Sequence, residues 1–167
     1  MKTAFFVRHA KSSWKDPSLA DLDRPLNKRG LRDAPFMADI MREEVSGGVD
    51  AFISSPARRA FTTATYFAKA YHHSPEDIRV EPDLYFEGVG RMLELLRSLP
   101  SEWARVAVFS HNPDITELAN RYSPQAIDNV PTCAFFRLDH PGESWLAFGD
   151  DQTRFGSFHF PKQYFSK

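Results

Sequence analysis

The chain has 167 residues, of which 42% are hydrophobic, and it carries a formal net charge of −1. This length and hydrophobic content predict one folded domain over residues 1–167 and argue against intrinsic disorder. A nearly neutral chain lacks the basic excess of a general nucleic-acid binder or of a protein that binds a membrane surface.

Two further features narrow the class of protein. No apolar run approaches the roughly 20 residues that a membrane-spanning helix needs, and the apolar run near the N-terminus is too short for a signal peptide. The single cysteine, Cys133, cannot form an internal disulfide and belongs to no metal-ligand cluster. We therefore expect a cytoplasmic protein that contacts neither membranes nor nucleic acids.

The first half of the chain alternates short apolar runs with helical patterns. Residues 2–8 and 50–54 are short and apolar, which predicts two buried strands. Between them a helical pattern begins near residue 26 and stops at the glycine pair 47–48. A second helix is predicted over residues 56–71, because a proline opens it. The stripe of the first helix that we expect to face the core consists of Leu31, Ala34, Ala38 and Met41.

The same alternation continues in the second half of the chain. The patterns predict a short strand at 78–80, a helix at 92–99, a strand at 104–109 and a helix at 115–120. After Asn129 the helical periodicity ends, and three strands joined by turns are predicted at 132–138, 145–148 and 155–160.

These elements predict an α/β fold. Alternating strands and helices favour a three-layer α/β/α sandwich, in which helices cover both faces of a mostly parallel central sheet. The run of consecutive strands near the C-terminus predicts an antiparallel edge on the same sheet.

Charged residues follow three of the predicted strands. Arg8 and His9 end the first strand, Arg58 and Arg59 lie just beyond the second, and His111 follows the strand at 104–109. Open α/β sheets bind their ligands at the carboxyl edge of the strands. If these strands are neighbours, the histidines and arginines converge on one small volume.

Such a group of residues is suited to phosphate chemistry. Guanidinium groups match phosphate oxygens in a bidentate way, and one histidine can attack phosphorus to form a phosphohistidine that water then hydrolyses. Attack requires a neutral nitrogen, which a backbone carbonyl bonded to the other ring nitrogen would secure. The arginines and a protonated second histidine would stabilise the transferring phosphoryl group. No carboxylate cluster lies at these strand ends, so we expect no metal and no cofactor.

Four sequence blocks occur in the order FFVRHAKSSW, DRPLNKRG, SSPARRAFTTA and FSHNPDITELAN. Together they resemble the histidine phosphatase superfamily, which has a phosphoglycerate mutase-like fold, and specifically its small SixA-type phosphohistidine phosphatase branch. The resemblance implies that His9 is the phosphorylated nucleophile and that Arg8, Arg59 and His111 form the phosphate pocket. It favours Arg59 over Arg58, because the family pattern S-S-P-x-x-R-A-x-x-T-A fixes that register.

Two positions bear on the substrate that the resemblance implies. Ala10 stands where the broader superfamily has the glycine of its R-H-G motif, which suits the SixA-type branch. Larger members of the superfamily use a glutamate as general acid, and Glu87 is the candidate for that role here. The alternative interpretation is that Glu87 is a solvated carboxylate in a loop. An alkoxide leaves poorly without a proton donor, whereas an imidazole leaves readily. A site without a committed acid should therefore favour P–N or aryl phosphate bonds.

Further residues lie near the same edge of the predicted sheet. We predict that four of them contact the substrate, and Trp14 either lines the pocket mouth or caps its own loop. Asp21 and Asp23 are interpreted as turn and cap residues, with a role as proton donor as the alternative. The predicted substrate contacts are Lys11, Arg24, Asn112 and Thr132.

The sequence thus predicts a metal-independent phosphatase that acts through phospho-His9 on a phosphorylated protein, most specifically on protein phosphohistidine. Three alternatives stay open: a small-molecule phosphomonoesterase or mutase on the same fold, a phosphate- or phosphoprotein-binding module without turnover, and a metallohydrolase that uses His9, His111 and a carboxylate. Short connections leave no room for a capping subdomain and predict an open pocket. We expect a monomer.

Overall fold

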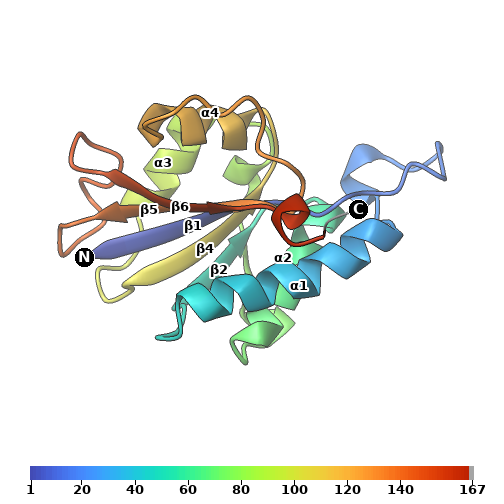
Figure 1. Ribbon diagram of the computed structural model, residues 1–167, viewed down its shortest axis with the longest axis horizontal. Helices are drawn as coiled ribbons and strands as arrows, with labels where there is room; N and C mark the ends of the chain where they lie inside the picture. The colour runs from blue at the N-terminus through green and yellow to red at the C-terminus, as the bar shows by residue number, and fades with distance from the viewer. Residues whose placement is uncertain (166–167) are drawn as a thin grey trace.

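The computed structural model describes residues 1–165 and contains a six-stranded sheet in the order β3-β2-β4-β1-β5-β6 (Figure 1). Strands β1 to β4 pair in parallel, whereas β5 is antiparallel to β1, and β6 is antiparallel to β5. The predicted mostly parallel sheet with an antiparallel edge is confirmed. The strands are β1 (Lys2–Arg8), β2 (Ala51–Ser54), β3 (Arg79–Val80), β4 (Arg105–Ser110), β5 (Phe135–His140) and β6 (Arg154–His159).

Helices cover both faces of this sheet, as the three-layer prediction required. Figure 1 shows α1 and α2 on one face and α3 and α4 on the other. The α-helices are α1 (Lys28–Glu44), α2 (Arg58–Ala70), α3 (Val89–Arg97) and α4 (Asp114–Tyr122). Short 3-10 turns are η1 (Asp21–Asp23), η2 (Pro75–Asp77), η3 (Pro82–Leu84) and η4 (Pro161–Gln163).

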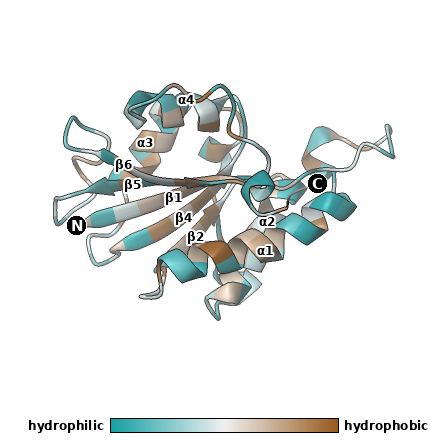
Figure 2. Ribbon diagram, in the orientation of Figure 1, coloured by the Kyte–Doolittle hydropathy of each residue, from teal (hydrophilic) through white to brown (hydrophobic). Residues whose placement is uncertain are grey.

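Strand β1 lies at the centre of the sheet because both of its faces are apolar. Successive side chains of a strand point to opposite faces. Phe5 and Val7 therefore pack in the core under α1 and α2, whereas Ala4 and Phe6 pack in the core under α3 and α4. Figure 2 shows that the central strands are hydrophobic over much of their length, whereas the ends of α1 are hydrophilic.

Helix α1 begins at Lys28, two residues later than its sequence pattern predicted, because Asn27 caps it. The Asn27 side chain accepts a hydrogen bond from the Gly30 backbone N–H at 2.9 Å. The predicted stripe is wrong at Leu31, which is 46% exposed. Gly30 takes the buried position instead, because the loop after β1 approaches so closely that a Cβ there would lie 2.3 Å from the carbonyl oxygen of Lys11.

The predicted strand at 145–148 is wrong, because the segment is a turn. Its Phe148 N–H donates to the Trp145 carbonyl at 3.0 Å. Trp145 and Phe148 are buried and Leu146 is 77% exposed. Apolar residues spaced three apart thus face the core from one side of a turn, without the period of two that a strand requires.

The predicted strand at 132–138 begins only at Phe135. Cys133 adopts a left-handed backbone with φ of 62°, and the Ala134 N–H donates to the Pro131 carbonyl at 3.1 Å. This turn keeps the preceding residues out of the sheet. The other predicted strands and helices are confirmed, with ends shifted by a few residues. No helix within residues 1–165 is both long and apolar enough to span a membrane.

Candidate active site

The three strands with charged ends are neighbours in the sheet, in the order β2-β4-β1. All three run in parallel, and the register pairs Arg8 with Ser110 and Ser54 with Phe109. The residues that follow these strands therefore emerge at one carboxyl edge, where open α/β sheets bind ligands. The two histidine rings meet there, with the centroids of His9 and His111 5.1 Å apart.

His9 is held in the tautomer that a nucleophile needs. Its Nδ1 lies 2.8 Å from the carbonyl oxygen of Ala10. Because a carbonyl oxygen only accepts, Nδ1 carries the proton and Nε2 keeps its lone pair. Nε2 has no hydrogen-bond partner within the described part of the chain. Burial lowers the pKa of His9 to about 4, and the cations of Arg59 and Arg8 act in the same direction against the Ala10 hydrogen bond. The ring is therefore neutral at pH 7.

His111 is anchored by Ser55, whose Oγ lies 2.8 Å from Nε2. The same Oγ accepts the Ala57 N–H at 3.1 Å, so its own proton is available to Nε2. Burial, together with the nearby His9 and Arg59, lowers the pKa of His111 to about 2. His111 is therefore neutral near pH 7 in this structure, and it can act as a cation only if a bound dianion raises its pKa.

Arg8 and Arg59 bring the positive charge to the pocket. The Arg8 Nη1 donates to the Val130 carbonyl at 2.9 Å, and its buried Nε has no partner among residues 1–165. Arg59 is 5% exposed, whereas the neighbouring Arg58 side chain is exposed to solvent. An unpaired buried donor such as the Arg8 Nε is costly unless a ligand satisfies it, and the guanidinium groups of both arginines match phosphate oxygens in geometry and charge.

Asp21 orients Arg59 from η1. Its backbone carbonyl accepts from Arg59 Nη1 at 2.7 Å and its Oδ2 accepts from Nη2 at 2.9 Å. The Tyr85 hydroxyl donates to the same Oδ2 at 2.6 Å. Although partial burial raises the pKa of Asp21, the hydrogen bonds from Tyr85 and Arg59 outweigh it and lower that pKa below its usual value. Sequence reasoning interpreted Asp21 as a turn residue and missed this contact.

Thr63 joins the loop after β1 to helix α2. Its buried Oγ1 accepts the Ala10 N–H at 2.9 Å and donates to the Arg59 carbonyl at 2.7 Å. The side chain therefore links the backbone of the residue after His9 to the backbone of Arg59. Thr63 appears in the SSPARRAFTTA block, but its role as a link could not be read from that block.

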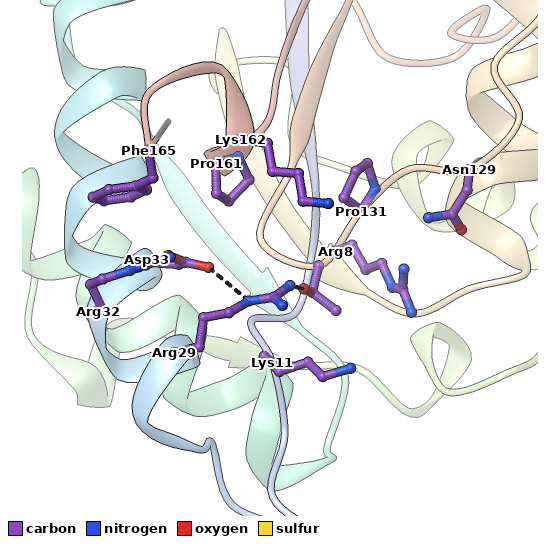
Figure 3. Close-up of a pocket in the computed structure, with 11 residues that line it drawn as sticks. Arg8, Lys11, Arg29, Arg32, Asp33, Asn129, Pro131, Pro161, Lys162 and Phe165 are labelled. Carbon is purple, nitrogen blue, oxygen red and sulfur yellow. Dashed lines mark hydrogen bonds and ion pairs between the residues drawn. The ribbon is translucent and has the colours of Figure 1, made fainter. Parts of the chain in front are cut away.

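The other predicted site residues differ in what they contact. Lys11 and Thr132 line a hollow that also includes Arg8 (Figure 3). Arg24 stabilises its own loop: its guanidinium lies 3.8 Å from the centre of the Trp14 ring and donates to two loop carbonyls. Trp14 is 65% exposed, so this stacking covers one side of the ring only.

Asn112 and Glu87 have contrasting surroundings. The Asn112 side chain accepts from the Thr116 N–H at 3.1 Å and donates to Asn129 at 2.9 Å, so it holds the start of α4 to the following loop. Glu87 is exposed and makes no hydrogen bond or ion pair to residues 1–165. Beside it, the ring of Phe86 lies 4.8 Å from that of His111. Among the described residues, no group of three or more His, Cys, Asp or Glu could hold a metal ion.

The model of the histidine phosphatase superfamily (branch 1) matches residues 4–85. An uncharacterized protein of Mycobacterium tuberculosis is 32% identical over 113 residues, which cover 68% of this chain and 67% of that protein. The chain spans about two thirds of the length of this protein and of an uncharacterized chloroplastic protein of Arabidopsis thaliana, and the full length of an uncharacterized protein of Mycobacterium leprae.

Solved structures share the fold over nearly the whole chain. A protein from Agrobacterium tumefaciens, named as a candidate phosphohistidine phosphatase SixA, has a TM-score of 0.79 at 23% identity, over 96% of this chain and 98% of its own. The protein histidine phosphatase SixA complexed with tungstate has a TM-score of 0.76 at 23% identity, over 93% of this chain and 95% of its own.

Fold and site together define an α/β protein with paired histidines and arginines at the carboxyl edge of a mostly parallel sheet. The chain belongs to the histidine phosphatase superfamily, and its fold is of the SixA type.

Proposed function

We propose that this chain is a metal-independent phosphatase that works through a phosphohistidine on His9. We also propose that residues 1–167 form one catalytic domain. The observation that carries the proposal is the Nδ1 contact of His9 with the Ala10 carbonyl at 2.8 Å. It leaves Nε2 unprotonated beside a second histidine and two guanidinium groups. Membership in the histidine phosphatase superfamily supports phosphatase activity.

The reaction has two displacement steps. In the first, the His9 Nε2 lone pair forms a bond to phosphorus, the bond from phosphorus to the substrate breaks, and its electron pair leaves with the substrate. In the second, water attacks the phosphohistidine, the N–P bond breaks, and inorganic phosphate is released. Arg8 and Arg59 stabilise the phosphoryl oxygens in both steps. The lowered pKa of His9, about 4, keeps Nε2 available at pH 7.

We propose protein phosphohistidine as the substrate. An imidazole leaving group needs little help from an acid, and Glu87, the predicted donor, lies exposed without a partner within residues 1–165. The phosphorylated residue of a partner protein could reach an open site as a side chain. The relative complexed with tungstate, an oxyanion, is named a protein histidine phosphatase. The proposal includes a cytoplasmic monomer that needs no cofactor.

The test is to trap the phosphoenzyme. Wild-type protein is mixed with a phosphohistidine protein, an aryl phosphate or an alkyl phosphate, and acid-labile phosphate on the enzyme is mapped by mass spectrometry. We expect the label on His9, fastest turnover of the P–N bond, and activity that survives a strong chelator. His9→Ala should lose turnover with its fold intact by circular dichroism. Comparable activity in His9→Ala, or fastest turnover of the alkyl ester, would refute the assignment.

A further inference from the structure

A second hollow of about 550 Å³ lies beside the catalytic pocket and shares Arg8 with it (Figure 3). It lies between the first turns of α1, the loop before β5 and the turn at the C-terminal end. Arg8 lines the hollow, and its charge also acts on both His9 and His111, so the hollow lies next to the proposed phosphoryl site. Its charged lining residues are Arg8, Lys11, Arg29, Arg32, Asp33 and Lys162.

The hollow carries a strong excess of positive charge, although the whole chain has a net charge of −1. Among residues 1–165, Asp33 is the only acidic residue that lines it. Its Oδ1 accepts from Arg32 at 2.8 and 2.9 Å, and its Oδ2, which makes no hydrogen bond there, lies 3.7 Å from Arg29. The ammonium groups of Lys11 and Lys162 have no hydrogen-bond or ion-pair partner among residues 1–165. Several cations thus remain available to a ligand.

This charge does not serve the stability of α1. The positive end of a helix dipole lies at its N-terminus, where acidic residues stabilise and basic ones destabilise. The first turn of α1 contains no acidic residue, and Lys28 and Arg29 lie there. Arg29 also donates to the Thr132 hydroxyl at 3.3 Å, which turns its guanidinium toward the hollow (Figure 3). Helix field and side chains therefore add to one another in attracting an anion.

The uncharged part of the lining combines polar Asn129 and Thr132 with three apolar residues, and this mixture suits a polypeptide. Pro131, Pro161 and Phe165 line the hollow. The Arg32 guanidinium lies 4.0 Å from the centre of the Phe165 ring, and this stacking holds it in place. In such a hollow the cations can bind the carboxylates of an extended peptide, while the proline and aromatic side chains contact its apolar atoms.

We propose that this hollow binds carboxylate side chains next to the phosphorylated residue, so that the enzyme prefers phosphohistidine within an acidic segment of its protein substrate. The inference rests on the proposed function, because it assigns a substrate preference to the same site. When the phosphoryl group of such a segment lies at His9, the side chains next to it can reach the hollow, because Arg8 borders both places.

The test uses two peptides of equal length with one phosphohistidine, flanked by glutamates in one and by glutamines in the other. We expect wild-type kcat/KM to be about tenfold higher for the glutamate peptide, from a few exposed ion pairs of ordinary strength. Arg32→Gln/Lys162→Gln should reduce this ratio to about twofold. Lys69→Gln/Arg91→Gln, which removes the same charge from exposed sites on α2 and α3, should keep the wild-type ratio.

Each outcome separates the two proposals. If wild-type enzyme hydrolyses both peptides with equal kcat/KM, the hollow has no such role and the phosphatase assignment stands. If neither peptide is hydrolysed, the proposed function itself fails. A preference that survives Arg32→Gln/Lys162→Gln would overturn the assignment of these residues. Lys162→Gln alone removes an exposed side chain without touching Asp33, so it tests the inference even if loss of Arg32 disturbs folding.

Discussion

Both terminal nitrogens of Arg59 are already hydrogen-bonded to Asp21, at 2.7 and 2.9 Å. A phosphate that binds Arg59 must share it with this carboxylate, and in return it meets a guanidinium whose direction is fixed. Holding a group in its productive orientation contributes to rate because less freedom is lost in the transition state. Asp21 is therefore a positioning residue that acts through Arg59.

This role predicts a graded effect of two substitutions. Asp21→Ala should lower kcat/KM about tenfold, because one of the two contacts that orient Arg59 is lost. Asp21→Asn keeps an oxygen that can accept from Nη2, so it should restore most of the activity. Arg59→Ala should cost more than either, about 10²–10³ in rate. Steady-state kinetics on an aryl phosphate measure all three variants. Equal losses for Asp21→Ala and Asp21→Asn would show that charge, not orientation, is what Asp21 supplies.

Sequence reasoning reached the pocket residues that end strands but not their partners. His9 and His111 could be proposed because strand ends of a parallel sheet share an edge, whereas the choice of Arg59 over Arg58 depended on the family pattern that the SSPARRAFTTA block resembles. Asp21 and Ser55 could not, because their contacts with Arg59 and His111 join residues 38 and 56 positions apart. Such pairings depend on how loops fold over the sheet, which no short pattern encodes.

At the scale of elements, the loop after β1 and helix α1 fit together at Gly30. The loop carries His9 and Ala10, and the Asn27 N–H donates to the Lys11 carbonyl at 2.9 Å. A side chain at Gly30 would press on that same carbonyl, since its Cβ would lie 2.3 Å away. The contact is with backbone, so it cannot be relieved by a change of rotamer.

Gly30→Ala should therefore destabilise the protein by about 1–3 kcal/mol, the usual cost of overpacking, and should lower activity by shifting the loop that carries His9. Gly90→Ala is the matched control: Gly90 lies in α3 with no atom within 4 Å of an added Cβ. That change should be neutral or stabilising by up to about 1 kcal/mol, because alanine favours helix. Urea unfolding of both variants measures the difference. Equal stabilities would contradict the close approach.

The predicted elements succeeded or failed for physical reasons. The central strands are apolar on both faces, and this local property marks them in the sequence. The segment 145–148 is equally apolar, but its two aromatic side chains reach the core from a turn, and the Trp145 Nε1 donates to the Trp103 carbonyl at 2.9 Å. Hydrophobicity correctly predicted that the two aromatic side chains are buried. It predicted the backbone conformation wrongly, because a short apolar run does not distinguish a strand from a buried turn.

For the whole molecule, the two site histidines link folding to pH. The pKa of His9 is about 4 and that of His111 about 2, mainly because both are buried. Their ordinary value is about 6.5, which the unfolded chain restores. Between these values the unfolded chain binds protons that the folded chain excludes. Their contribution to stability is therefore complete above pH 6.5 and is lost progressively as the pH falls toward 4 for His9 and toward 2 for His111.

Each histidine should therefore lower the free energy of unfolding by about 1.4 kcal/mol per pH unit well below pH 6.5. We expect His111→Asn, and independently His9→Asn, to reduce the slope between pH 5.5 and 4.5 by about that amount relative to wild type. Urea unfolding at intervals from pH 7.5 to 4.5 gives the slopes, so a uniform loss of stability from the substitution does not affect the result. Carboxylates such as Asp21, whose pKa lies below its usual value, contribute mainly at lower pH. Slopes identical to wild type would mean that both rings accept protons in the folded protein and that the pocket is far wetter than its burial implies.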